Sequence, residues 1–105
     1  MRRIFRQGDI LLIEVSKKPK GIAKKETFKG QDCILAEGEA TGHHHRVKNA
    51  VATLLTLAAG ERILQLQKEA AFVHEEHGEI MLPTGDWQVI RQKEYTPRGI
   101  REVLD

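Results

Sequence analysis

The sequence has little cysteine and few aromatic residues. It contains one cysteine, and its three phenylalanines, one tryptophan and one tyrosine make up 5% of the chain. A single cysteine excludes an internal disulfide, so stability must come from non-covalent packing. Cys33 is followed by Ile34 and Leu35. We interpret it as a core side chain, because a thiolate nucleophile needs an activating environment.

Long apolar runs are also missing. No stretch approaches the ~20 residues that a membrane-spanning helix needs. The basic start, residues 1–6, leads into the chain without the apolar core of a signal peptide, so we expect a cytoplasmic protein without membrane contact. The 105 residues, 40% hydrophobic and 30% charged, have the composition of one soluble globular domain spanning 1–105.

The sequence also lacks a strong excess of positive or negative charge. The chain carries 17 basic and 15 acidic residues, a formal net charge of +2, so there is no strong nucleic-acid signal, and a protein partner stays open. Lysines are nevertheless concentrated in the first connecting region. We interpret that region as a solvated loop, with contact to phosphate or to an acidic partner as the alternative. The lysines are Lys17, Lys18, Lys20, Lys24, Lys25 and Lys29.

Short apolar segments separated by turn residues dominate what the sequence does contain. Such segments are typical of antiparallel sheets. Roughly eight of them predict an all-β fold, a small barrel or rolled antiparallel sheet. The clearest of the expected strands are 9–15, 33–37, 43–48, 63–67, 71–73, 79–82 and 87–95.

The middle of the chain fits two patterns. Apolar residues in 47–59 fall at helical spacing and also alternate, and residues 61–76 are rich in good helix formers. Residues 63–67, in contrast, alternate with the period of a strand. We favour strands throughout 47–76, with two helices as the alternative.

Glycine and proline predict the connections. Residues 17–31 are polar and contain one proline and two glycines, so we expect a long connection with at most one weak strand around Ile22 or Phe28. Gly38 and Gly42 lie just before the first histidines. They predict a bend or bulge whose backbone angles an alanine would resist.

The last third predicts a hairpin or a corner. Residues 83–86 form a turn after a short strand. Trp87 and Val89 alternate in the strand that follows, and we expect both to face the core. Residues 100–104 predict either a last edge strand or a short terminal helix.

The polar residues around these strands receive structural roles. Arg91, Glu94 and Tyr95 form either a polar patch beside the histidines or a cross-strand ladder, and we favour the ladder. Asp9 and Asp86 stand at strand starts or turns. A short acid commonly bonds to the backbone there.

Five histidines provide the main candidate site. Three are consecutive, at 43–45, and two more follow at 74 and 77. Since side chains alternate across a strand, His43 and His45 share one face and His44 takes the other. Imidazoles that converge from neighbouring strands suit a divalent metal such as zinc, nickel or iron. The expected metal ligands are His43, His45, His74 and His77.

Acidic residues flank the histidines. Their carboxylates are candidates for further ligands or for acceptors that orient the imidazoles. The alternative is a set of surface or half-buried histidines that bond to these acids without any metal. The acids are Glu37, Glu39, Glu75 and Glu76.

Two known metal motifs are only partly matched. His74 and His77 are three residues apart, whereas the helical zinc-protease box needs its histidines four apart, so we reject that box. His43 and His45 form an HxH pair like that of a cupin-like barrel, which would make the protein a small metal-dependent enzyme. The acidic ligand of that motif is displaced, and Gln88 stands where its last histidine would be.

Three segments carry a family resemblance. They are QGDILL at 7–12, LAEGEATGHHH at 35–45 and VHEEHGEIMLPTG at 73–85, with a further match at 91–95. Together they resemble a family of small, uncharacterised bacterial proteins over most of the chain. The resemblance implies a compact domain with strands around residues 64 and 73, and it names no ligand. We therefore expect a binding module first, a small metal-dependent enzyme second and a protein-interaction module third.

Overall fold

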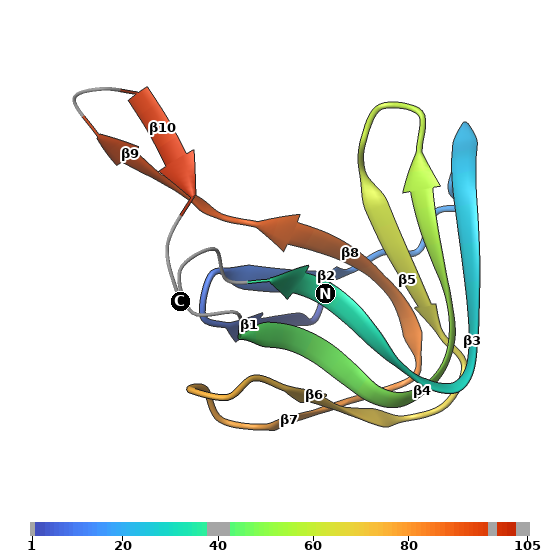
Figure 1. Cartoon of the computed structure of the whole chain (residues 1–105). Coiled ribbons are helices and arrows are strands. Elements are labelled where there is room, and N and C mark those ends of the chain that lie inside the picture. The colour runs from blue at the N-terminus through green and yellow to red at the C-terminus, as the bar shows by residue number, and fades with distance from the viewer. Residues whose placement is uncertain (1, 38–42, 97–98, 103–105) are drawn as a thin grey trace.

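The structure, a computed structural model, describes residues 2–37, 43–96 and 99–102. All the regular secondary structure in these ranges consists of β-strands (Figure 1), which confirms the predicted all-β class. The described residues include no helix that is long and apolar enough to cross a bilayer. The strands are β1 (Ile4–Gln7), β2 (Ile10–Glu14), β3 (Ile22–Glu37), β4 (His44–Leu57), β5 (Arg62–Leu66), β6 (Ala70–Val73), β7 (Ile80–Leu82), β8 (Gly85–Arg91), β9 (Lys93–Thr96) and β10 (Gly99–Glu102).

The long strand β4 organises the main sheet. One edge of β4 pairs with β3 along most of its length. Two strands share the other edge, since residues 46–47 pair with β6 and residues 52–56 pair with β5. From β5 the sheet continues through β8 and β2 to β1, and from β6 it continues to β7. All these ladders are antiparallel, and the sheet curls into a nearly closed barrel (Figure 1).

Alternate side chains of the curled sheet fill the interior. Ile10 and Leu12 on β2, Phe72 on β6 and Trp87 on β8 are fully buried. Phe5 packs edge-on against Trp87, with 5.3 Å between the ring centroids. Each fully buried aliphatic or phenylalanine side chain contributes about 1.5–3 kcal/mol. The period-two pattern therefore supplies much of the driving force for closure.

The strands predicted for the middle of the chain are confirmed, and the helical alternative is wrong. Residues 47–76 form most of β4 and all of β5 and β6. In the centre of β4, the consecutive residues 52–55 are all buried, so both faces of the strand are covered here. A strand that is buried on both faces does not need to alternate apolar and polar residues. The sequence of this segment therefore fitted a helix as well as a strand.

The long connection predicted for residues 17–31 is wrong from Ile22 onward, where the weak strand expected around Ile22 or Phe28 is part of a 16-residue strand. β3 begins there and runs to Glu37, and nearly all its side chains up to residue 32 are exposed. It therefore lacks the apolar alternation by which strands are recognised. Its backbone is held by the ladder to β4, whose register shifts on both sides of Gln31, next to Gly30 at φ +103°. Such irregularities are common in edge strands.

A corner, one of the two predicted forms, links β7 to β8. The two strands do not pair with each other, since β7 pairs with β6 while β8 pairs with β2 and β5. The indole N–H of Trp87 donates to the carbonyl oxygen of Pro83 at 3.1 Å and fixes the corner. Near the C-terminus, the predicted edge strand is present as β10, which pairs with β9. Gly38 and Gly42 lie outside the described residues, so the predicted bend stays a prediction.

Two arginines join strands that share no ladder. Arg62 on β5 donates to the carbonyl oxygen of Leu35 on β3 at 2.7 Å, and Arg91 on β8 donates to that of Glu37 at 2.9 Å. Burial lowers the pKa of Arg62, although a guanidinium stays charged in proteins. These bonds satisfy carbonyl groups at the edge of β3 and hold it to the opposite wall of the barrel.

Candidate metal site

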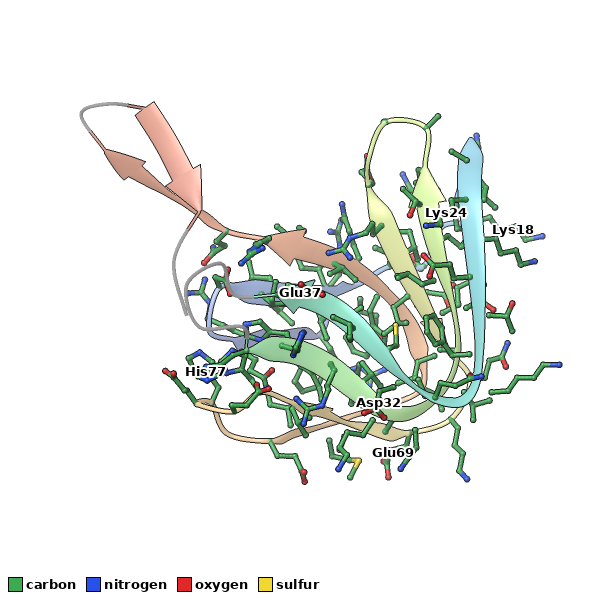
Figure 2. All side chains as sticks on the ribbon, viewed as in Figure 1. Lys18, Lys24, Asp32, Glu37, Glu69 and His77 are labelled. Atoms are coloured by element: carbon green, nitrogen blue, oxygen red, sulfur yellow. The ribbon has the colours of Figure 1, made fainter. Side chains whose placement is uncertain are left out.

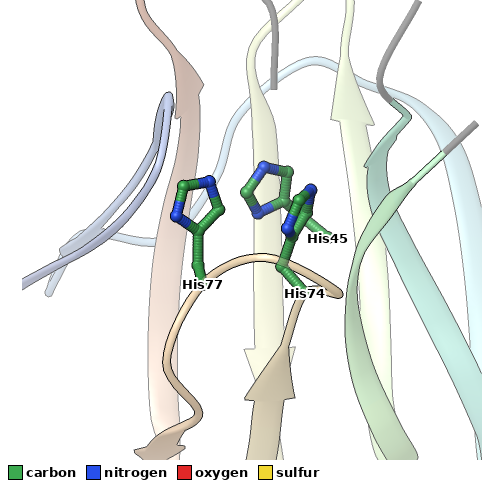
Figure 3. Close-up of side chains that lie close together, drawn as sticks. All are labelled: His45, His74 and His77. Carbon is green, nitrogen blue, oxygen red and sulfur yellow. The ribbon is translucent and has the colours of Figure 1, made fainter. Parts of the chain in front are cut away.

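Three histidines converge at one end of the barrel. His45 lies near the start of β4, whereas His74 and His77 lie in the irregular segment between β6 and β7 (Figure 3). One potential ligand atom from each of the three lies within 4.8 Å of the others. The ladder between β4 and β6, in which Arg46 faces Val73, brings the two segments together.

The three rings pack closely against one another. The ring centroids of His45 and His74 are 4.2 Å apart, and those of His74 and His77 are 4.6 Å apart. His45 is 0% exposed and His74 is 6% exposed, while His77 is half-buried. Neutral imidazole is the form that binds a metal.

The turn between β1 and β2 clasps the ring of His45. Nδ1 of His45 lies 3.0 Å from Oε1 of Gln7, whose Nε2 donates to the carbonyl oxygens of Phe72 and Gly78 at 2.9 Å each. Because the amide nitrogen is committed to two acceptors, Oε1 must accept, and Nδ1 of His45 carries the proton. Nε2 of His45 is then the ring atom with a lone pair for a metal.

Asp9 approaches that second nitrogen. Its Oδ1 lies 3.1 Å from Nε2 of His45, an ion-pair distance without the alignment of a hydrogen bond. Its Oδ2 accepts a hydrogen bond from Nε of Arg91 at 2.8 Å, and the carboxylate is 1% exposed. Asp9 therefore places a buried negative charge beside His45. Its predicted role as a backbone acceptor is wrong for the carboxylate, which contacts two side chains.

Gly8 allows the turn to come this close to the histidines. Gly8 has a φ of +58°, whereas Asp9 does not have a positive φ. This is the pattern of two-residue hairpin turns in which glycine is the first turn residue. A Cβ at Gly8 would lie 2.6 Å from Nε2 of His77 and 3.2 Å from Cε1 of His45. A side chain at this position would therefore be strained by the backbone conformation and would require the ring of His77 to move.

His74 is held by its own loop. The backbone N–H of Glu76 donates to Nδ1 of His74 at 3.0 Å. A neutral ring that accepts at Nδ1 carries its proton on Nε2. Ligation of a metal by His74 therefore requires the ring to rotate out of this hydrogen bond, a change of side-chain torsion within one loop.

His43 and His44 occupy different surroundings. The ring of His43 meets that of His74 edge-on, with 5.5 Å between centroids, and its Nδ1 lies 3.0 Å from Oε1 of Glu76. It borders the three clustered histidines without joining their group of ligand atoms. His44 has its ring nitrogens 3.9 Å from carboxylate oxygens of Glu37 and Glu75.

Glu75 ties the loop to β4. Its carboxylate accepts from the backbone N–H of His44 at 3.1 Å and from Arg46 at 3.2 Å. Partial desolvation opposes ionisation, but these contacts prevail and lower the pKa of Glu75. Of the four predicted acids, Glu39 lies outside the described residues, and the other three contact His43 or His44.

The partial motif matches do not describe this arrangement. Of the HxH pair, His45 has a ligand atom in the group of three, whereas His43 borders the group through the ring of His74. His74 and His77 meet because their loop folds back, not because they lie on one helix. Sequence reasoning missed Gln7, Gly8 and Asp9, although the Gly-Asp turn signal between two apolar segments marks their position.

Arg91 has features of both predicted arrangements. It faces Ile10 in the ladder between β2 and β8, and its guanidinium binds Asp9, the residue before Ile10. The other oxygen of Asp9 lies beside His45, so Arg91 is also part of a polar patch near the histidines. The predicted roles of the Glu94 and Tyr95 side chains stay predictions.

Comparison with known proteins identifies a family for this chain. No curated protein and no solved structure matches it. A family model does match, over residues 6–92, a range that includes the three clustered histidines, the turn that clasps them and Arg91. Because the match covers most of the chain, the protein belongs to the family described as a domain of unknown function, DUF8820.

Proposed function

We propose that this protein is a small binding domain for a divalent metal, with His45, His74 and His77 as ligands. The observation that carries the proposal is the approach of three imidazole ligand atoms to within 4.8 Å of one another. Three imidazole nitrogens are a ligand set that suits zinc and nickel.

The three ligand atoms lie within 4.8 Å of one another, which is farther apart than the ligand atoms of a bound metal. With zinc–nitrogen distances of about 2.0–2.1 Å, tetrahedral ligand nitrogens lie about 3.4 Å apart. Rotation of the His74 ring, together with a small shift of the half-buried His77, would draw the atoms inward. His45 needs no such change, because Gln7 already holds it in the required tautomer.

The neighbouring charges also support a cation. Asp9 contributes a buried carboxylate whose Oδ1 lies beside Nε2 of His45, while Arg91 binds the other oxygen, Oδ2. A metal ion between ring nitrogens and carboxylate would be stabilised by Asp9 even without direct ligation. We propose His43, whose ring contacts His74, as the nearest candidate for a fourth nitrogen ligand.

A titration with zinc or nickel, followed through the histidine ring signals in NMR, tests the proposal. We expect the ring signals of His45, His74 and His77 to move in the wild type. His77→Ala removes a half-buried ligand and should weaken binding strongly, as should His45→Ala. The matched control is His44→Ala, because His44 interacts with Glu37 and Glu75 instead.

Two outcomes would overturn this assignment. The first is the absence of any ring shift at a modest molar excess of metal. The second is loss of binding in His44→Ala with binding intact in both His45→Ala and His77→Ala. In either case the histidines form a purely structural hydrogen-bonded cluster, and a protein-interaction module becomes the leading function.

Metal binding should depend on pH. Protons compete with the metal for the same imidazole nitrogens, so affinity should fall below about pH 6 and be retained above neutrality. Zinc titrations at a series of pH values measure this. Affinity that stays constant between about pH 5 and pH 7.5, a range that includes the ordinary imidazole pKa of about 6.5, would exclude histidine as the main ligand.

A further inference from the structure

A second recess lies at the other end of the barrel from the histidines. It has a volume of about 670 Å³ and is formed where β2 ends, β4 ends and β5 begins. Figure 2 labels Lys18 near this recess and His77 on the opposite side of the molecule. The recess thus shares no lining residue with the candidate metal site.

The recess has an apolar floor and a basic rim. Val15, Leu57 and Ile63 line it, and Ile63 is almost fully buried. The other principal lining residues are three lysines of the segment between β2 and β3, all of them exposed: Lys17, Lys18 and Lys20. Lysine stems cover apolar surface while their ammonium groups remain in water. The lysines therefore extend the apolar wall and place positive charge at the mouth.

The recess has little negative charge to balance the lysines. Glu61 is the one acidic residue among the lining residues, and its carboxylate accepts a hydrogen bond from the side-chain amide of Gln88 at 3.2 Å. Three ammonium groups thus face one carboxylate. The lining residues include no aromatic side chain, so a stacked nucleic-acid base has no platform there.

We propose that this recess binds an amphipathic organic anion, with an aliphatic tail on the floor and a carboxylate at the lysine rim. The volume lies within the range of small-molecule sites, about 300–1,000 Å³. The tail would remove the partly exposed apolar surface of Val15 and Leu57 from water and would contact Ile63 at the base of the recess. The lysines would supply the selectivity for negative charge.

Calorimetric titration with decanoate tests the assignment, with 1-decanol as the neutral analogue. The test variant is the triple substitution Lys17→Gln, Lys18→Gln and Lys20→Gln. Exposed ion pairs are individually weak, so the loss of three should reduce decanoate affinity by about tenfold. The matched control removes the same charge from exposed lysines of β3 that do not line the recess: Lys24→Gln, Lys25→Gln and Lys29→Gln.

Three results would overturn the proposal. They are the absence of decanoate binding, an equal loss in both triple variants, and equal affinity for 1-decanol and decanoate. Methyl signals of Val15, Leu57 and Ile63 should move in NMR when decanoate binds, and shifts confined to other residues would place the ligand elsewhere. His77→Ala should leave decanoate binding unchanged, which separates this site from the metal proposal.

Discussion

His45 shows how a single side chain acquires its chemical state from residues far away in the sequence. Gln7, 38 residues earlier, accepts from its Nδ1, and Asp9 approaches its Nε2. Both groups belong to one turn, and the glycine between them leaves room for the ring. Tautomer, orientation and nearby charge are therefore all set by the segment from Gln7 to Asp9.

Gly8→Ala is expected to disturb the histidine cluster as well as the fold. The substitution combines a strained φ of +58° with a Cβ 2.6 Å from Nε2 of His77. Gly30→Ala is the matched control, because Gly30 has φ +103° but open space around it. Strain alone costs about 1 kcal/mol. Urea unfolding should therefore show a larger loss of stability for Gly8→Ala, and only that variant should weaken zinc binding. Equal effects of the two variants on zinc binding would contradict the close contact.

Cys33 is expected to be inert in the folded protein. It is fully buried, and burial raises the pKa of its thiol from 9.0 to about 12. Since the thiolate is the reactive form, a thiol reagent at pH 8 should label the protein only after unfolding in guanidinium. The raised pKa also means that the stability from the buried neutral thiol is lost as pH rises from about 9 towards 12. Rapid labelling of the native protein would show that Cys33 is accessible.

At the scale of elements, the histidine cluster depends on a contact between strands that do not pair. β1 and β6 share no ladder, yet Gln7 at the end of β1 donates to the carbonyl oxygen of Phe72 on β6 and to that of Gly78 beyond it. One side chain thus closes this end of the barrel and positions His45. Loss of closure and loss of the site should therefore occur together.

Gln7→Leu is expected to lower the free energy of unfolding by about 2 kcal/mol, because it removes two hydrogen bonds to backbone carbonyl groups, one of them buried. It should also weaken metal binding, since His45 loses the acceptor at Nδ1. The control is Gln88→Leu, which removes only an exposed bond to Glu61. Urea unfolding and zinc titration measure the two effects. If urea unfolding gives the same free energy of unfolding for Gln7→Leu and Gln88→Leu, Gln7 does not close the barrel.

At the scale of the whole molecule, long-range pairing dominates. Strands β1 to β8 form one antiparallel sheet that curls into a nearly closed barrel, in which β4 pairs with three other strands along its two edges, and β9 and β10 form a separate two-stranded sheet. The far-ultraviolet circular dichroism spectrum should accordingly be dominated by strand. More than about a third helix, the ordinary globular average, would contradict the architecture and would place His74 and His77 one helical turn apart.

Much of this architecture was predictable because strand alternation is a local signal. Ile10 and Leu12 on β2, and Trp87 and Val89 on β8, alternate within a few residues, and all four are buried as expected. The first half of β3 could not be recognised in this way. It is held by backbone pairing to β4, which leaves no apolar pattern in its exposed lysine-rich side chains.

The sequence by itself determined the all-β class, the buried strands and the histidines as the residues with metal-binding chemistry. Only the tertiary structure decided which histidines meet, grouping His45 with His74 and His77 and leaving His43 at the border. It also decided that Asp9 and Arg91 lie beside them. The physical reason is that alternation depends on neighbouring residues, whereas convergence depends on the register of β4 against β6 and on closure of the barrel, to which distant residues contribute together.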